Sequence, residues 1–148
     1  MKHIIGLVVT LVTLASCGAV ATAQQPAKIP RIGFQLDSSP SAVSARLEAF
    51  RQGLRELGYV EGKNIVIEWR SAEGKLDRLP DLATELVRLK VNVLVSGGGN
   101  SATRALKQAT TLIPIVMMFG SDPVVAGLVS SLARPGGIVT GLTSITGT

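Results

Sequence analysis

The chain has 148 residues, of which 46% are hydrophobic and 17% charged, a composition that suits one modest packed domain rather than a disordered segment. The formal net charge of +5 is spread thinly, and no run of lysine and arginine forms the clustered patch that nucleic-acid binding requires. A single cysteine excludes an internal disulfide.

Residues 1–23 predict a secretory signal peptide. A short basic start precedes an apolar run over residues 4–15, which is too short for a membrane span of about 20 residues. Two processing sites then compete: cleavage after Ala23 fits an ordinary signal peptidase, whereas residues 14–17 fit a lipobox in which Cys17 is lipidated. We therefore expect an exported, periplasmic or extracytoplasmic protein, anchored by lipid if Cys17 is kept. The only histidine, His3, leaves with the leader in both cases.

Residues 24–30 form a polar linker, and the predicted domain begins at residue 31. Residues 31–36 predict a strand. Ser39 and Pro40 then suit the N-cap and first position of a helix that Gly58 stops. The apolar side chains of this helix recur at spacings of three and four, which predicts one buried face: Val43, Leu47, Phe50, Leu54 and Leu57.

The rest of the chain alternates in the same way. After a turn at 59–63 we expect strands at 64–69, 91–95, 114–119 and 138–142. Asp77 is expected to cap a second helix, whose inner face is Leu79, Leu82, Leu86 and Leu89. Asn100 or Ser101 is expected to cap a third helix, whose inner face is Ala102, Ala105, Leu106 and Ala109. Asp122 and Pro123 predict the start of a fourth helix, whose apolar stripe is Val125, Leu128, Val129 and Leu132.

Five strands alternating with four helices predict an α/β fold: a three-layer parallel sheet with helices on both faces and the flavodoxin-like strand order 2-1-3-4-5. Ligands of such sheets bind beyond the carboxyl ends of the strands, near the point where the order reverses. Three predicted loops meet there, and they supply the candidate ligand-binding residues Asp37, Ser38, Ser39, Gly98, Gly99, Asn100, Ser101, Ser121 and Asp122.

The glycine loop 97–101 is the strongest local signal. Glycines let a ligand approach the backbone, and the free N–H groups of the next helix would stabilise a carboxylate or phosphate. A tight turn with a polar cap, binding nothing, is the alternative. Gly97, Gly99 and Ala102 also fit a loose dinucleotide fingerprint, but after the third strand rather than the first. Asp122 is explained equally well as a helix cap.

Without histidine or a free thiol, the mature chain has no means to build a Ser–His triad, a cysteine nucleophile or an imidazole zinc site. The glutamates fall on predicted solvated faces and turns, and none is paired as a general acid and base. We therefore do not expect an enzyme, although a site built from carboxylates stays open, and we expect no metal or cofactor.

Several segments resemble the substrate-binding proteins of ABC transporters, of the tryptophan/tyrosine type with the type I periplasmic binding protein fold. The resemblance depends on residues 50–59, 61–64, 77–80, 111–116, 122–124, 131–137 and 139–141. The sequence departs from the family at Ile138, where asparagine is usual, and at the glycine loop 97–99, which often carries threonine or proline.

The resemblance implies that residues 31–148 form the N-terminal lobe of a two-lobed receptor whose second lobe is missing. Such a receptor captures a small polar ligand, for example an amino acid, as its lobes close, and delivers it to an ABC permease in the membrane. We expect it to act as a monomer. Two alternatives remain open: a nucleotide-binding, Rossmann-like enzyme domain that uses the Gly97 loop, or a ligand sensor with no part in transport.

Overall fold

A computed structural model describes residues 28–144, so the predicted signal peptide and Cys17 lie outside the described residues. Five parallel strands form one sheet in the order β2-β1-β3-β4-β5, which confirms the predicted order. The strands are β1 (Arg31–Leu36), β2 (Val66–Ser71), β3 (Val93–Ser96), β4 (Ile115–Met117) and β5 (Val139–Gly141). The helices are α1 (Ser44–Glu56), α2 (Leu79–Arg88) and α3 (Gly99–Ala109), with 3₁₀ turns η1 (Pro40–Val43) and η2 (Leu76–Arg78).

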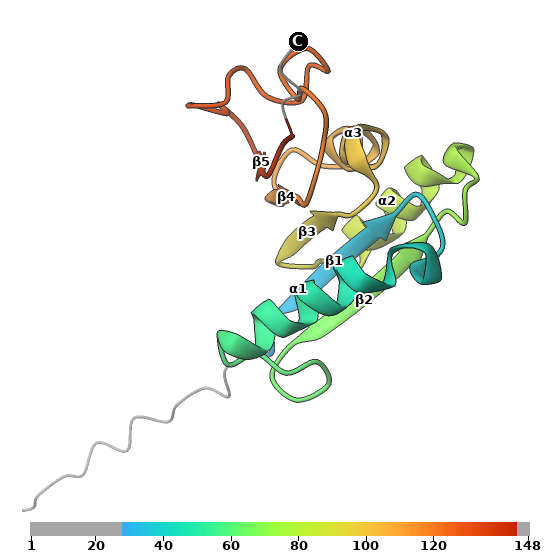
Figure 1. Cartoon of the computed structure of the whole chain (residues 1–148), viewed down its shortest axis with the longest axis vertical. Helices are drawn as coiled ribbons and strands as arrows, with labels where there is room; N and C mark the ends of the chain where they lie inside the picture. The colour runs from blue at the N-terminus through green and yellow to red at the C-terminus, as the bar shows by residue number, and fades with distance from the viewer. Residues whose placement is uncertain (1–27, 145–148) are drawn as a thin grey trace, which may run out of the picture.

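Helices cover both faces of the sheet, which confirms the three-layer architecture (Figure 1). In β1 successive side chains alternate between the two cores: Phe34 packs with Leu47 of α1, whereas a Cβ on Gly33 would lie 3.2 Å from Leu86 of α2. The larger cluster lies between the sheet, α2 and α3, where Leu86 and Leu106 are fully buried. Burial of these apolar faces is the main driving force for the fold.

The predicted first helix is divided into η1 and α1. Ser39 caps η1 as predicted, its Oγ accepting a hydrogen bond from Ala42 N at 3.4 Å. Gly58, at φ +87°, ends α1, and the Tyr59 N–H bonds back to Leu54 O at 2.8 Å. The prediction that Leu57 faces the core is wrong: it follows the last helical turn and is 76% exposed.

The predicted side-chain caps of the next two helices are also wrong. Asp77 lies inside η2, and α2 begins after Arg78 without a side-chain cap. α3 begins at Gly99 after Gly98, so Asn100 and Ser101 lie in its first turn rather than before it. The Asn100 amide bonds instead to a neighbouring loop, described below, and is therefore not used as a cap.

The predicted fourth helix is absent from the described residues. After Asp122 the backbone makes a single turn, in which Ala126 N bonds to Asp122 O at 3.0 Å. Gly127, at φ +69°, then reverses the chain and ends the turn. Of the predicted stripe, Leu128 is buried but Val125 is 84% exposed.

The four predicted strands after the first begin one or two residues too early, a small error of position that leaves their order intact. None of the helices described between residues 28 and 144 is long and apolar enough to cross a membrane.

Candidate functional site

The loops that follow β1, β3 and β4 meet at one edge of the sheet, which we call the carboxyl edge. Gly98 packs against Asp37, where an added Cβ would lie only 2.6 Å from the Asp37 nitrogen. The Asn100 Nδ2 donates a hydrogen bond to Ser121 O at 2.6 Å. The structure thus brings the three predicted loops together, as parallel strands with this order require.

The glycines at this edge have different roles. A Cβ on Gly97 would lie 2.5 Å from the Phe34 ring, and one on Gly120 would lie 2.6 Å from Asn100 Oδ1. Together with Gly98, these glycines are needed for close packing between protein segments. Gly99 differs, because its φ of +63° requires glycine while the space beside it is open apart from Phe119, 3.7 Å away.

Buried polar side chains hold the first turn of α3 beneath the loops. Thr103 Oγ1 donates at 2.8 Å to Gly99 O and lies 2.8 Å from Ser96 Oγ, and both side chains are fully buried. Gln35, the register partner of Ser96, donates from Nε2 to Leu79 O at 2.7 Å and so links β1 to α2. Sequence reasoning missed these residues, although a glutamine inside the apolar strand 31–36 was a visible signal.

The predicted polar side chains are partly engaged in their own loops. Ser39 Oγ caps η1 and lies 3.0 Å from Ser41 Oγ, whereas Asp122 Oδ1 accepts from Val125 N at 3.0 Å. Ser101 and Asp122 are exposed, and Asp37 and Ser38 are half-buried. These exposed groups, together with the N–H groups of the first turn of α3, could bind a small polar or anionic group.

Two further segments reach the same edge and were missed by sequence reasoning. Gly74, after β2, donates from its backbone N to Asp37 O at 2.8 Å, and Thr143 Oγ1 donates to Gly120 O at 2.9 Å. The guanidinium of Arg46 in α1 lies above the ring of Phe119, with 4.5 Å from Cζ to the ring centroid. The sequence pattern did not single out Arg46.

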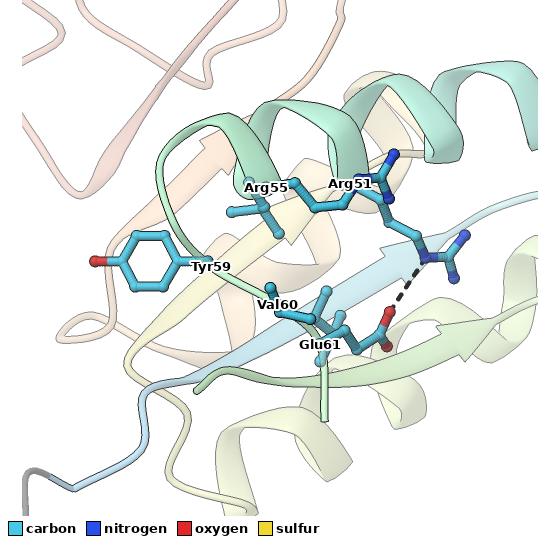
Figure 2. Close-up of a pocket in the computed structure, with 7 residues that line it drawn as sticks. Arg51, Arg55, Tyr59, Val60 and Glu61 are labelled. Carbon is cyan, nitrogen blue, oxygen red and sulfur yellow. Dashed lines mark hydrogen bonds and ion pairs between the residues drawn. The ribbon is translucent and has the colours of Figure 1, made fainter. Parts of the chain in front are cut away.

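A surface pocket of about 230 Å³ lies at the opposite end of α1, away from the carboxyl edge (Figure 2). Its walls come from α1, the turn after it and β2, with Arg51, Arg55 and Glu61 at its rim and Leu54, Tyr59, Val60 and Ile67 completing the lining.

Each charged group of this pocket has a partner of opposite charge, either within the pocket or on α1. Glu61 Oε2 lies 3.1 Å from Arg51 Nε, and Glu61 Oε1 accepts from Trp69 Nε1 at 2.8 Å. Arg55 Nη2 donates to Glu48 Oε1 at 2.7 Å, and this hydrogen bond holds the pKa of Glu48 below its ordinary value of 4.5. The pocket is therefore explained as the junction that holds the 59–63 turn against α1 and β2.

Known proteins have sequences similar to the part of this chain that contains the three loops. The family model described as ABC transporter substrate binding protein matches residues 35–146. A tyrosine-binding protein of Clostridioides difficile (strain R20291) is 37% identical over 107 residues, which cover 72% of this chain and 30% of that protein. The chain thus spans less than a third of this curated relative.

Three solved structures are similar in both fold and sequence. A conserved domain protein of Vibrio cholerae O1 biovar El Tor has 33% identity and a TM-score of 0.74 over 80% of this chain and 40% of that one. The ligand-free, open structure of a substrate-binding protein with adhesive properties from Clostridium difficile has 28% identity and a TM-score of 0.75, covering 81% and 40%. An ABC domain of Streptococcus pneumoniae in complex with L-Trp has 28% identity and a TM-score of 0.71, covering 77% and 38%.

Proposed function

Because the chain belongs to the family of ABC transporter substrate-binding proteins and has the fold of the first lobe of a type I periplasmic binding protein, we propose that it forms one wall of a ligand-binding cleft. The cleft captures a small polar ligand, an amino acid by this proposal, when a second lobe closes over it. The ligand then passes to an ABC permease. Capture requires binding without chemical change, so the proposed role is that of a receptor and not an enzyme.

The observation that carries this proposal is the meeting of the three loops at the carboxyl edge. The Asp37–Gly98 contact and the Asn100–Ser121 hydrogen bond hold the loops in one surface. A surface fixed before the ligand arrives loses little conformational entropy on binding. The proposed contacts are the predicted ones: Asp37, Ser38, Ser39, Gly98, Gly99, Asn100, Ser101, Ser121 and Asp122.

An amino acid fits this surface because its carboxylate can accept hydrogen bonds from the N–H groups at the start of α3. The names of two similar proteins support the same class of ligand, since one is a tyrosine-binding protein and another was solved with L-Trp. A lone lobe covers only one side of a ligand, so high affinity needs the second lobe and its closure.

The receptor must work outside the cytoplasm to meet its solute. We propose that residues 1–23 export it and that Cys17, if retained, tethers it to the membrane by lipid. The intact mass of the mature protein separates the two forms: a lipid-modified N-terminal Cys17 supports the tether, and an N-terminal Gln24 contradicts it.

The nucleotide-binding alternative loses its main support in the structure. Of the two fingerprint glycines, Gly97 is required by its contact with Phe34 and Gly99 by its φ of +63°, so neither needs a dinucleotide to explain it.

Isothermal titration calorimetry of the complete gene product with a panel of L-amino acids tests the proposal. We expect binding heat and a raised melting temperature with at least one amino acid. The absence of heat and of any thermal shift across the panel would refute the amino-acid ligand. A thermal shift with millimolar nicotinamide cofactor in place of amino acids would instead favour the enzyme alternative.

A further inference from the structure

Arg46 and Phe119 form a contact at the carboxyl edge that the sequence pattern does not explain. Arg46 lies in the first turn of α1, and Phe119 lies two residues beyond the end of β4. The guanidinium carbon is 4.5 Å from the ring centroid, which is a cation–π contact between segments far apart in the sequence. The contact joins α1 to the predicted ligand loops.

The position of Arg46 is electrostatically unfavourable for a structural residue. The N-terminus of a helix is its positive end, and the first turn of α1 holds no acidic residue to offset the arginine. The other arginines of α1 are paired, Arg51 with Glu61 and Arg55 with Glu48. Among residues 28–144, no carboxylate lies within ion-pair distance of Arg46. Its charge is therefore left available to an incoming anion.

Phe119 is partly exposed at this edge. It lies beside the open space at Gly99, and its ring is only half-buried. Together with Arg46 it closes a narrow apolar slot that includes Phe34, Leu36 and Val43 and has no room for a water molecule. Because the inner side is filled, a ligand can reach the pair only from the outer side, where the proposed cleft lies.

We propose that Arg46 and Phe119 are the specificity-determining pair of this cleft, an inference that depends on the proposed function. Arg46 shares the ligand carboxylate with the N–H groups at the start of α3 and donates to it from its planar guanidinium. Phe119 offers its ring to the apolar or aromatic part of the same ligand. A guanidinium next to a half-buried ring matches an amino acid with a large apolar side chain, in which the carboxylate and the side chain are attached to the same carbon.

The test compares an amino acid with its amide, which lacks the carboxylate charge. Calorimetry is carried out on the complete gene product with L-tyrosine and L-tyrosinamide, or with the tightest-binding amino acid of the panel and its amide. We expect Arg46→Gln to weaken binding of the amino acid by roughly 10- to 100-fold, the loss of a charge-assisted bond, and to leave binding of the amide nearly unchanged. Arg55→Gln, at the far end of the same helix, is the matched control and leaves both affinities unchanged.

A second variant tests the ring. We expect Phe119→Leu to reduce the preference for L-tyrosine over L-leucine by several-fold, because an aliphatic side chain loses the aromatic contact but keeps its bulk. Melting temperatures of the free variants identify any that fail to fold, and Arg46→Lys, which keeps the charge but loses the planar fork, then provides a milder change.

The outcomes separate this inference from the proposed function. If the wild-type protein binds no amino acid, the proposed function fails and the pair fails with it. If the wild type binds and Arg46→Gln binds both amino acid and amide like the wild type, only the pair is overturned. Equal weakening of amino acid and amide would also overturn the carboxylate role, because it would mean that Arg46 acts through the shape of the loops.

Discussion

Asn100 Nδ2 lies 2.6 Å from Ser121 O, so a side chain in the first turn of α3 holds the loop that follows β4. The other side-chain atom, Oδ1, is buried next to Gly120 and has no hydrogen-bond partner among the described residues. The side chain thus fits its site only with its donor directed at Ser121. Two loops of the proposed cleft therefore behave as one unit.

Replacing Asn100 should separate these loops. Asn100→Ala removes one hydrogen bond and should lower the free energy of unfolding by about 1 kcal/mol. Asn100→Asp should cost more, because it replaces the donor with an oxygen facing Ser121 O and brings a charge into a partly buried site. Urea denaturation measures both changes.

Ser101→Asp is the matched control for this pair of variants. It introduces the same carboxylate one residue later, at an exposed position in the first turn of α3, where the helix dipole favours negative charge. We expect it to leave stability unchanged or slightly raised. Asn100→Asp with wild-type stability would show that the Asn100–Ser121 bond does not hold the loops.

The same substitution at two glycines should have opposite effects. Gly98→Ala places a methyl group 2.6 Å from the Asp37 backbone, so the loops must move apart at a cost of about 1–3 kcal/mol, with weaker ligand binding. Gly53→Ala lies inside α1 with no atom within 4 Å of the new methyl group, and should stabilise by about 0.5–1 kcal/mol. Thermal and urea unfolding check both signs, and a neutral Gly98→Ala would contradict the close packing of the loops.

The pocket of Figure 2 should prove structural. Glu61→Ala removes the acceptor of the Trp69 indole and the partner of Arg51, and should destabilise by about 1 kcal/mol. Trp69 is the only tryptophan, so its fluorescence and indole N–H resonance report the loss directly. Ligand affinity should stay the same, because the pocket lies at the opposite end of α1. A large drop in amino-acid affinity would assign the pocket to binding instead.

The repeating pattern of apolar residues predicted the sheet and three of its helices, since each element buries a face that is visible in its own sequence. Leu47 and Leu86 recur at helical spacing and are buried where expected. The spacing of Val125, Leu128, Val129 and Leu132 looked the same, yet only Leu128 is buried. Gly127 explains why this segment forms a single turn and not a helix, because its left-handed backbone ends the turn after a few residues.

The candidate site was predictable only at the level of its loops. Parallel strand order places the three loops at one edge, and this needed no knowledge of side-chain contacts. The contacts themselves join distant segments: Gly98 with Asp37, and Arg46 with Phe119. No local pattern encodes such pairs, so the sequence alone did not single out Arg46.

The hydrogen bond from Arg55 to Glu48 should make the stability of the chain depend on pH in the acid range. It holds the pKa of Glu48 below its ordinary 4.5 in the folded chain. A depressed carboxyl pKa contributes stability at pH values above the unfolded value, and this contribution is lost as the pH falls through the folded pKa. The wild type should therefore lose more stability than Glu48→Gln when the pH drops from neutral to below 4.5.

Carbon-detected NMR titration of the Glu48 side chain measures its pKa directly. Arg55→Gln should return that pKa toward 4.5, because it removes the hydrogen bond and the neighbouring charge that cause the shift. Added salt should act in the same direction through screening, since both side chains are exposed to solvent. A Glu48 pKa of 4.5 or above in the wild type, unmoved by Arg55→Gln, would show that the two side chains do not pair in solution.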